Sequence, residues 1–478
     1  MIEPSCQIYT FPTQIFRELD EHMCEQMNVQ ETSEELRTTL NMSDQIEQSL
    51  RCATKCFGAQ WLPLVSRKSH FPNAEVQNFI QDSWRAARGE MLKVINRPSY
   101  RSILALYLFA QTPVPIGISE DEELDGMSGP VCIQTALLQL QQLRERLRSL
   151  QLNGLNSESS AGSTNISTDY VDFESRAYWA AMMWDTSSSL AMSSRTSLTS
   201  GLKGACSEPT WRVVKAFLVA SFHPRTEHWH TEGVEVTNVV ACEIISAAVI
   251  CKTYIWKNIT SLKEALREGV DEAGVQFAWT ALLDAIAIFK TSISPLLSSC
   301  ERQLHFLDQR IRLNWFEVNL QYHLGILVLA AALESADRRD LLSEFSAARQ
   351  DAELESFNVL KFGLETTYTV YGPRDNTNTG PEVDELSQQT FTASIIAIDP
   401  YPQYVVEAVL LMNKVFGRKY RQEEINHDTY TYLSSILDKA LGQVPQGSKL
   451  VQAARQNLQR SRNNIESIYV TNTALGAI

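Results

Sequence analysis

The sequence predicts an all-α fold: a globular domain built from many helices around a buried core. Only 20 Gly and 16 Pro occur in 478 residues, too few for a fold made of short strands and frequent turns. Apolar residues recur at intervals of three and four along most of the chain, as on a helix with one buried face. Alternation with a period of two is rare, and no repeat of fixed length appears, which favours a single globular domain over a helical solenoid.

The composition is that of a globular protein with a large core. Hydrophobic residues make up 44% of the chain and charged residues 21%, the usual balance of a soluble domain. No unbroken apolar run reaches the roughly 18 residues that cross a bilayer. The first residues, Met-Ile-Glu-Pro-Ser-Cys, lack the basic start and apolar core of a secretory signal. We therefore expect no membrane partner.

Charge limits the partners further. The chain has 42 basic and 56 acidic residues, a net charge of −14, and an acidic protein repels the phosphate backbone of nucleic acids. The run Arg418-Lys419-Tyr420-Arg421 is the best local candidate for a nucleic acid contact. Glu423 and Glu424 follow it directly, so we interpret it as a solvated helix end. We expect no direct nucleic acid binding by this chain.

The N-terminal residues 1–70 mix short amphipathic stretches with polar ones. Thr32-Ser-Glu-Glu has the composition of a helix start. We expect this segment to form a helical arm, and residues 71–478 to form the main all-helical domain.

The main domain begins with three well-marked helices. Val76, Phe79, Ile80 and Trp84 stand at helical spacing in the first of them, over 74–95. Pro98 suits the first turn of the next helix, 99–110. A long helix rich in leucine follows over 130–151.

Two segments are expected to be flexible loops. Residues 153–169 are mostly Asn, Gly, Ser and Thr, and residues 372–383 begin Gly-Pro-Arg-Asp-Asn-Thr-Asn-Thr-Gly-Pro. The other expected helices cover 176–184, a segment from 209 that His223-Pro-Arg ends, 237–256, 274–293, 301–334 with a bend near 314–315, 338–364, 384–395, 403–416, 428–441 and 448–465.

Nine cysteines are present at irregular spacings, and no Cys-x-x-Cys occurs. Cys52 and Cys56 are one helical turn apart, but a metal would need two further ligands. Single cysteines among apolar neighbours, such as Cys242 and Cys251, are typical of small core residues in a reducing compartment.

The stretch from Ser175 to Thr196 is the most informative in the chain. It contains Ser-Arg-Ala-Tyr-Trp-Ala-Ala-Met-Met-Trp-Asp, and two aromatic residues with two methionines at helical spacing indicate a largely buried helix. Asp185 would then be a buried carboxylate that needs a partner. We expect a structural ion pair between Asp185 and Arg176 or Arg195.

This stretch resembles the middle homology region of fungal binuclear zinc-cluster transcription factors. In that family an Arg precedes an aromatic pair, an Asp comes six residues after the pair, and a Gly-Arg-Pro follows about nine residues later. Arg176, Tyr178, Trp179, Asp185 and Arg195 stand at these positions. Ser194 and Thr196 replace the Gly and Pro.

A second stretch, 320–329, resembles the family's late helix, which carries an aromatic-His pair before an apolar run. The pair here is Tyr322 and His323, and the family's Arg-Pro after the run is replaced by Ala331-Ala-Leu-Glu. The apolar helix over 102–111 stands where the family has its first helix, so the resemblance covers about residues 75 to 340.

The resemblance implies the regulatory domain of a fungal transcription factor. Such a domain is nuclear, controls the expression of metabolic genes and catalyses no reaction. It contacts protein partners or a second copy of itself and responds to effectors. For a small-molecule effector, Tyr178, Trp179, Trp184 and Trp211 are the candidate pocket residues; the alternative is that they only fill the core.

The zinc cluster of that family needs six cysteines within about thirty residues, because two zinc ions share the thiolates. Residues 1–60 offer four cysteines at other spacings. We therefore expect this chain to lack the zinc-cluster DNA-binding segment and to hold no cofactor, zinc belonging only to such a segment if one exists.

An alternative is a helical-scaffold enzyme, or a co-regulator that has lost DNA binding. The densest set of metal-ligand types is His223, His228 and His230, with Glu227 and Glu232. It follows Pro224, and we interpret it as an ordinary polar loop. No glycine-rich phosphate loop and no Gly-x-Ser-x-Gly occurs, so we expect neither a catalytic nor a metal site.

Overall fold

The computed structural model confirms the all-α prediction. It describes residues 13–27, 33–66, 73–156, 168–192, 194–198, 209–231, 233–371 and 390–475. The fold is 84% helical, and the one sheet within these ranges has two strands. Of the two expected loops, the parts 157–167 and 372–383 lie outside the described residues. The ends of the first expected loop, 153–156 and 168–169, are helical, because α7 (Gly129–Asn156) and α8 (Thr168–Met192) extend further than predicted.

The chain divides into two compact units that are not continuous in sequence. Unit 1 contains residues 1–60, 74–225 and 253–290, and unit 2 contains 61–73, 226–252 and 291–478. The expected boundary at residue 70, between an arm and a main domain, is not the division that the structure shows. Helices before residue 60 are part of the core of unit 1, because their apolar faces need the same partner helix.

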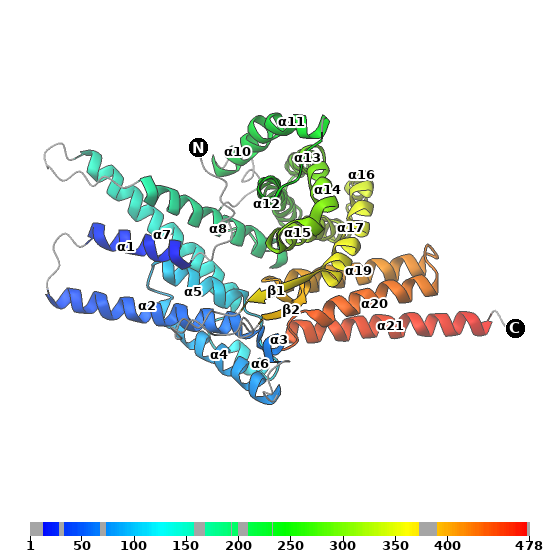
Figure 1. Ribbon diagram of the computed structural model, residues 1–478, viewed down its shortest axis with the longest axis horizontal. Coiled ribbons are helices and arrows are strands. Elements are labelled where there is room, and N and C mark those ends of the chain that lie inside the picture. The colour runs from blue at the N-terminus through cyan, green and yellow to red at the C-terminus, as the bar shows by residue number, and fades with distance from the viewer. Residues whose placement is uncertain are drawn as a thin grey trace, which may run out of the picture. The chain divides into compact units, whose positions relative to one another are not determined.

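Unit 1 is organised around helix α5 (Tyr100–Gln111), which lies between α2 (Ser33–Ala59) and α7 (Gly129–Asn156) and also packs against α1 (Thr13–Met27) (Figure 1). Ser99 caps α5 by accepting a hydrogen bond from the Ser102 amide at 3.0 Å. The other elements that contribute to unit 1 are α4 (Asn73–Val94), α6 (Glu120–Leu124), α8 (Thr168–Met192), α10 (Pro209–Ala216), η3 (Phe217–Phe222), α12 (Asn238–Glu268) and α13 (Glu272–Ile288).

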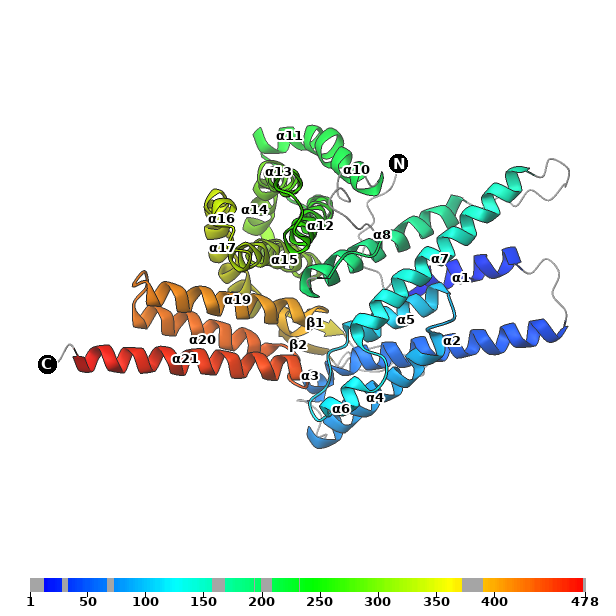
Figure 2. The ribbon, with the colours of Figure 1, turned by 180° about the vertical axis from the view of Figure 1, so that it is seen from behind.

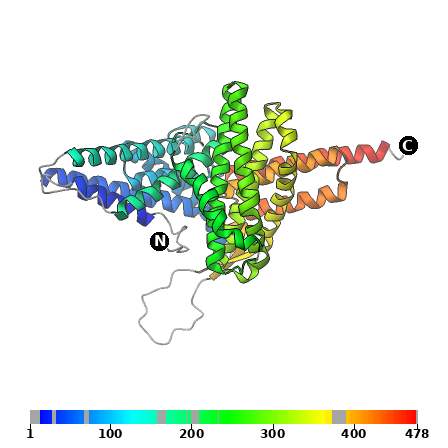
Figure 3. The same ribbon diagram turned by 90° about the horizontal axis from the view of Figure 1, so that it is seen from above.

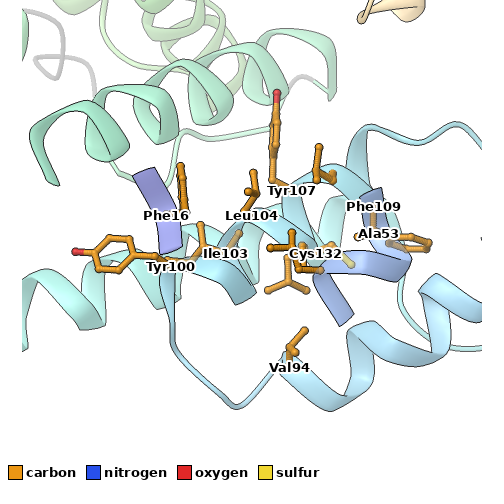
Figure 4. Close-up of a cluster of buried hydrophobic side chains, with 14 of the residues drawn as sticks. Phe16, Ala53, Val94, Tyr100, Ile103, Leu104, Tyr107, Phe109 and Cys132 are labelled. Atoms are coloured by element: carbon orange, nitrogen blue, oxygen red, sulfur yellow. The ribbon is translucent and has the colours of Figure 1, made fainter. Parts of the chain in front are cut away.

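Nearly every side of α5 is buried, so this helix is the centre of the core. Figure 4 shows Ile103, Leu104, Tyr107 and Phe109 projecting from it among side chains of the surrounding helices. A helix that is apolar all round is stable only inside a protein, which explains why the N-terminal helices fold against it.

Unit 2 is organised around α15 (Gln309–Ser335), which packs against α17 (Ser346–Glu365) and α19 (Pro402–Arg421). Figure 2 shows α19, α20 (His427–Gln443) and α21 (Lys449–Leu475) side by side, and Figure 3 shows the same orange and red helices from another direction. The remaining elements that contribute to this unit are α3 (Leu62–Ser66), α11 (His223–Thr231), the part of α12 up to Lys252, η4 (Phe289–Ile293), α14 (Ser294–Gln303), η5 (Leu304–Phe306), α16 (Arg339–Glu344), β1 (Thr367–Tyr371), β2 (Thr390–Ser394) and α18 (Ile395–Ile398).

Strands β1 and β2 pair antiparallel, with Thr369 opposite Thr392. The side-chain amide of Gln309 binds both backbone groups of Thr369, accepting from its N–H at 3.0 Å and donating to its C=O at 2.9 Å. A helix was expected over 384–395. The stretch Thr390-Phe-Thr is instead extended, since β-branched and aromatic residues fit a pleated strand, and α18 begins only after the Ser394 cap.

Two other helix boundaries differ from the prediction. The segment from Pro209 does not break at His223, because the π-helical turn η3 leads directly into α11. The wider turn leaves room for the Pro224 ring, which would clash in a regular α-helix. The expected bend near 314–315 is a break at 307–308, where the Asp308 amide donates to the Asn238 side chain at 3.0 Å.

Three described segments are long and apolar enough to cross a membrane by length and composition. They are 238–268, 272–306 and 309–335, and the protein itself buries 61%, 44% and 83% of their most apolar windows. The count of unbroken apolar runs missed them because single polar residues interrupt each run. The absence of a membrane partner stays a prediction.

Candidate functional site

The C-terminal half of α8 and the following loop, residues 194–198, form the best-defined polar arrangement in the motif region. Asp185 is only 4% exposed. Its Oδ1 accepts a hydrogen bond from the Ser197 amide and its Oδ2 accepts one from the Leu198 amide, both at 2.8 Å. One carboxylate therefore fixes two consecutive peptide groups of the loop, and charge-assisted bonds of this kind are strong.

Helix α12 holds the same loop from its other side. Lys257, which is fully buried, donates from Nζ to Thr196 Oγ1 at 2.9 Å. Its positive charge also acts on Asp185. We call Asp185, Thr196, Ser197, Leu198 and Lys257 the Asp185 clamp.

Two further contacts join α8 and its loop to α12. Lys263 donates from Nζ to the Leu190 carbonyl at 2.8 Å, where a cation is favoured near a helix C-terminus. Arg195 forms an ion pair with the buried Glu264 at 2.9 Å. The loop after α8 is therefore tied to α12 at several points within unit 1.

Burial and hydrogen bonding have opposite effects on the pKa of Asp185. Burial raises the pKa of this carboxyl above its ordinary value, while the two backbone amides and Lys257 lower it, and the net direction is upward. The chemistry of Asp185 is that of a structural anchor.

The expected ion pair of Asp185 with Arg176 or Arg195 is wrong. Arg176 pairs with Asp172 at 2.8 Å on an exposed face of α8, and Arg195 pairs with Glu264. The expected burial of Asp185 is correct. Its partners are backbone amides because the loop turns back over the end of α8, a geometry that sequence spacing does not reveal.

The four candidate pocket aromatics have different environments. Trp179 and Trp211 are in edge contact with ring centroids 5.7 Å apart, and Trp211 also contacts Tyr254, at 6.2 Å. Trp211 is fully buried, whereas Trp179 is half-buried. The structure thus brings Trp179 and Trp211 together with an aromatic residue of α12.

The other two aromatics have separate roles. Trp184 stacks on Tyr107 at 3.7 Å and lies in the core described above. Tyr178 lies under the guanidinium of Arg144 at 3.5 Å, a cation–π contact. A pocket shared by all four side chains is therefore not what the structure shows.

The histidine cluster lies on a helix and not on the expected loop. His223 and His230 stand two turns apart on α11, and His228 packs edge-on against Trp229 at 5.7 Å. Ligands of one metal must converge on a point. No group of three or more metal-ligand side chains is placed to hold an ion in the described ranges.

The cysteine prediction needs one correction. Cys52, Cys56, Cys132, Cys251 and Cys300 are free thiols, and burial raises the pKa of Cys56, Cys132 and Cys300 to about 12. Cys242, expected to be a free core thiol, is disulfide-bonded.

The basic run at the end of α19 is engaged by acids. Arg418 and Lys419 each contact the Glu353 carboxylate at 2.8 Å, and Arg418 also contacts Glu334 at 3.2 Å. Ion pairs of this kind compete with any binding of phosphate by the same side chains.

Helices α12 and α15 contain buried charged residues that the sequence-based predictions do not include. Lys257 and Lys252 interrupt the apolar run Ile250-Cys-Lys-Thr-Tyr-Ile-Trp-Lys, and Glu317 interrupts another. A charged residue inside an apolar helix is a visible signal, because it must be paired. The sequence does not show which residues pair with these charges, because the partners are far away in the chain.

Comparison with family models, with curated proteins and with solved structures found no match. A functional proposal for this chain therefore rests on its own residues and their arrangement.

Proposed function

We propose that this chain is the regulatory domain of a fungal transcription factor of the zinc-cluster type. It acts in the nucleus, controls the expression of metabolic genes through an effector or a protein partner, and catalyses no reaction. The observation that supports the proposal most is the Asp185 clamp. The residue at the family's Asp position fixes the loop that follows the motif helix.

The clamp gives the motif region the rigidity that a regulatory element needs. An effector shifts an equilibrium only if it binds two states of the protein differently. A loop held by a buried carboxylate and a buried ammonium has discrete bound and released states rather than a continuum, since a half-made buried ionic contact is costly.

The aromatic pair Trp179 and Trp211 is the candidate contact for an apolar effector. Trp179 lies six residues before Asp185 on α8 and is half-buried. Tyr254, which contacts Trp211, lies on α12, the helix that also carries Lys257. A ligand that contacts Trp179 would therefore act on α8 and α12, the two helices that carry Asp185 and Lys257 of the clamp.

A reporter assay tests the proposal. The full chain is placed between a heterologous DNA-binding domain and an activation domain, and output is compared with a fusion that lacks the chain. We expect the chain to change reporter output, and Asp185→Asn to relieve that change at equal protein level. Asp172→Asn, on the exposed face of the same helix, is the matched control and should behave as the parent.

Two outcomes would contradict the proposal. Output independent of the chain would remove its regulatory role, and equal effects of Asp185→Asn and Asp172→Asn would remove the role of the clamp. The co-regulator alternative predicts a different result: the unfused chain, supplied separately, changes the output of a complete factor.

A further inference from the structure

Three basic side chains surround one buried carboxylate where α15, α17 and α19 pack together in unit 2. Glu353 of α17 is 4% exposed. Its Oε1 accepts from Arg349 Nε at 3.1 Å and from Arg418 Nη2 at 2.8 Å, and its Oε2 lies 2.8 Å from Lys419 Nζ. A second carboxylate, Glu334 near the end of α15, accepts at Oε1 from Arg349 Nη2 at 2.5 Å and from Arg418 Nη1 at 3.2 Å. We call these five residues the Glu353 cluster.

The two carboxylates of the Glu353 cluster differ in how firmly they are held. Burial alone would raise the pKa of Glu353, but Lys419, Arg418 and Arg349 together hold it below its ordinary value, so this group stays ionised. The Glu334 side chain is 44% exposed, and the two arginines bind it at a single oxygen. Exposed ion pairs are weak. Glu334 is therefore the carboxylate that another anion displaces at the lower cost.

The charges of the Glu353 cluster leave one positive charge uncompensated. Three cations face two carboxylates, and without Glu334 the excess is two positive charges. A phosphate monoester carries a charge of about −1.5 to −2 at neutral pH. A carboxylate carries one negative charge, and so does each phosphodiester of a nucleic acid backbone. The charge balance therefore favours a phosphate monoester over a nucleic acid or another carboxylate.

The arrangement of the arginine donors also suits a phosphate. Arg349 and Arg418 each direct one N–H group to Glu353 and another to Glu334. The buried carboxylate thus holds both guanidinium groups in position, while the N–H groups that meet Glu334 converge on one oxygen atom. Guanidinium groups bind phosphate oxygens through strong charge-assisted hydrogen bonds. Side chains that are already fixed lose little conformational entropy when a ligand binds.

We propose that the Glu353 cluster is a binding site for a phosphate monoester, and that the Glu334 carboxylate occupies it when no ligand is bound. The phosphate replaces this carboxylate between Arg349 and Arg418, and Lys419 supplies the positive charge that balances a second negative charge. Free phosphate and a phosphorylated side chain of a partner protein both offer this dianion. The inference does not depend on the regulatory role proposed above.

Removal of the competing carboxylate tests the proposal. Titration calorimetry of the full chain with inorganic phosphate, at about pH 8 and constant ionic strength, measures the affinity for the dianion. Glu334→Gln should bind phosphate at least about threefold more tightly than the parent, because an internal competitor lowers the apparent affinity. Arg418→Gln should bind it at least about tenfold more weakly, since a charged donor is lost. A purely structural set of ion pairs predicts no gain of affinity in Glu334→Gln.

Asp337→Asn and Arg339→Gln are the matched controls. These residues form an exposed ion pair close to Glu334 in the chain, and both variants should bind phosphate as the parent does. If Arg418→Gln fails to fold, Glu334→Gln carries the test, because it changes an exposed side chain. Equal phosphate affinity of the parent and Glu334→Gln, or an equal gain in Glu334→Gln and Asp337→Asn, would overturn the proposal.

Two further probes separate the sources of the phosphate group. N-acetylphosphoserine amide carries the monoester on a peptide backbone. Tighter binding of this compound than of inorganic phosphate would assign the site to a phosphorylated partner, and binding that is no tighter would assign it to the free anion. Single-stranded oligothymidylate offers phosphodiesters. If it binds more tightly than both monoesters and Arg418→Gln abolishes that binding, the site recognises nucleic acid and the proposal is wrong.

Discussion

At the scale of single residues, the molecule uses buried aspartates to fix peptide groups that regular secondary structure leaves free. Asp185 binds the amides of Ser197 and Leu198. Asp20 of α1 does the same for α5, accepting from the Tyr100 amide at 2.6 Å and the Arg101 amide at 3.0 Å. Asp20 lies at the N-terminus of α5 and so also benefits from the helix dipole. These contacts satisfy backbone donors and stabilise the buried carboxylates.

Replacing the carboxylate tests how much the clamp contributes. Asp185→Ala leaves the Ser197 and Leu198 amides without their acceptor. It also removes the negative charge that acts on the buried ammonium of Lys257, and breaking a buried ionic arrangement of this kind costs about 3–5 kcal/mol. Urea unfolding followed by tryptophan fluorescence measures the difference. The matched control is Asp172→Ala, whose exposed pair with Arg176 should contribute about 0–1 kcal/mol. Equal losses in the two variants would mean that the clamp is no stronger than a surface ion pair.

At the scale of elements, close contact between helices depends on small residues at defined positions. Gly363 of α17 faces α15, and a Cβ at this position would overlap the Phe316 ring and lie 2.9 Å from Ile396 Cγ1. Gly417 of α19, in contrast, has open space where its Cβ would stand. The two glycines are both helical, so they separate the effect of packing from that of backbone propensity.

Alanine substitution of the two glycines should have opposite effects on stability. Gly363→Ala should destabilise the protein by about 1–3 kcal/mol through overpacking, reduced by up to about 1 kcal/mol from the better helix propensity of Ala. Gly417→Ala gains the propensity without the clash and should be neutral or stabilising. Denaturant midpoints of the two variants check this, and a stable Gly363→Ala would show that α17 is free to move away from α15.

At the scale of the whole molecule, the sequence predicts elements whose signals are local. It does not predict contacts between residues that are far apart in the chain. The helix over 99–110 is predicted because its apolar run is local in the sequence, although Pro98 precedes the Ser99 cap and does not stand in the first turn. The two discontinuous units are not predicted, since the core of each unit joins segments that are far apart in the chain. Lys252 shows the same limit: its position in an apolar helix is visible, but Gln321 is 69 residues away.

The pH dependence of protein stability tests the burial of Lys252 against Gln321. Burial lowers the pKa of Lys252 from its ordinary value of 10.5 to about 7 in the folded state. Between these values the unfolded chain binds the proton and the folded chain does not, so stability conferred by this residue rises with pH across that window. Below about 7 both states bind the proton and the full cost of a buried ammonium is present.

Lys252→Met removes the titrating amine. The melting temperature of the parent relative to the variant should therefore rise as pH increases from about 7 to about 10, because only the parent gains stability when its buried lysine loses the proton. Lys439→Met, an exposed lysine of α20, should show a gap that does not depend on pH. If the melting difference between the parent and Lys252→Met is constant with pH, Lys252 titrates alike in both states, and the burial of its charge has no energetic consequence.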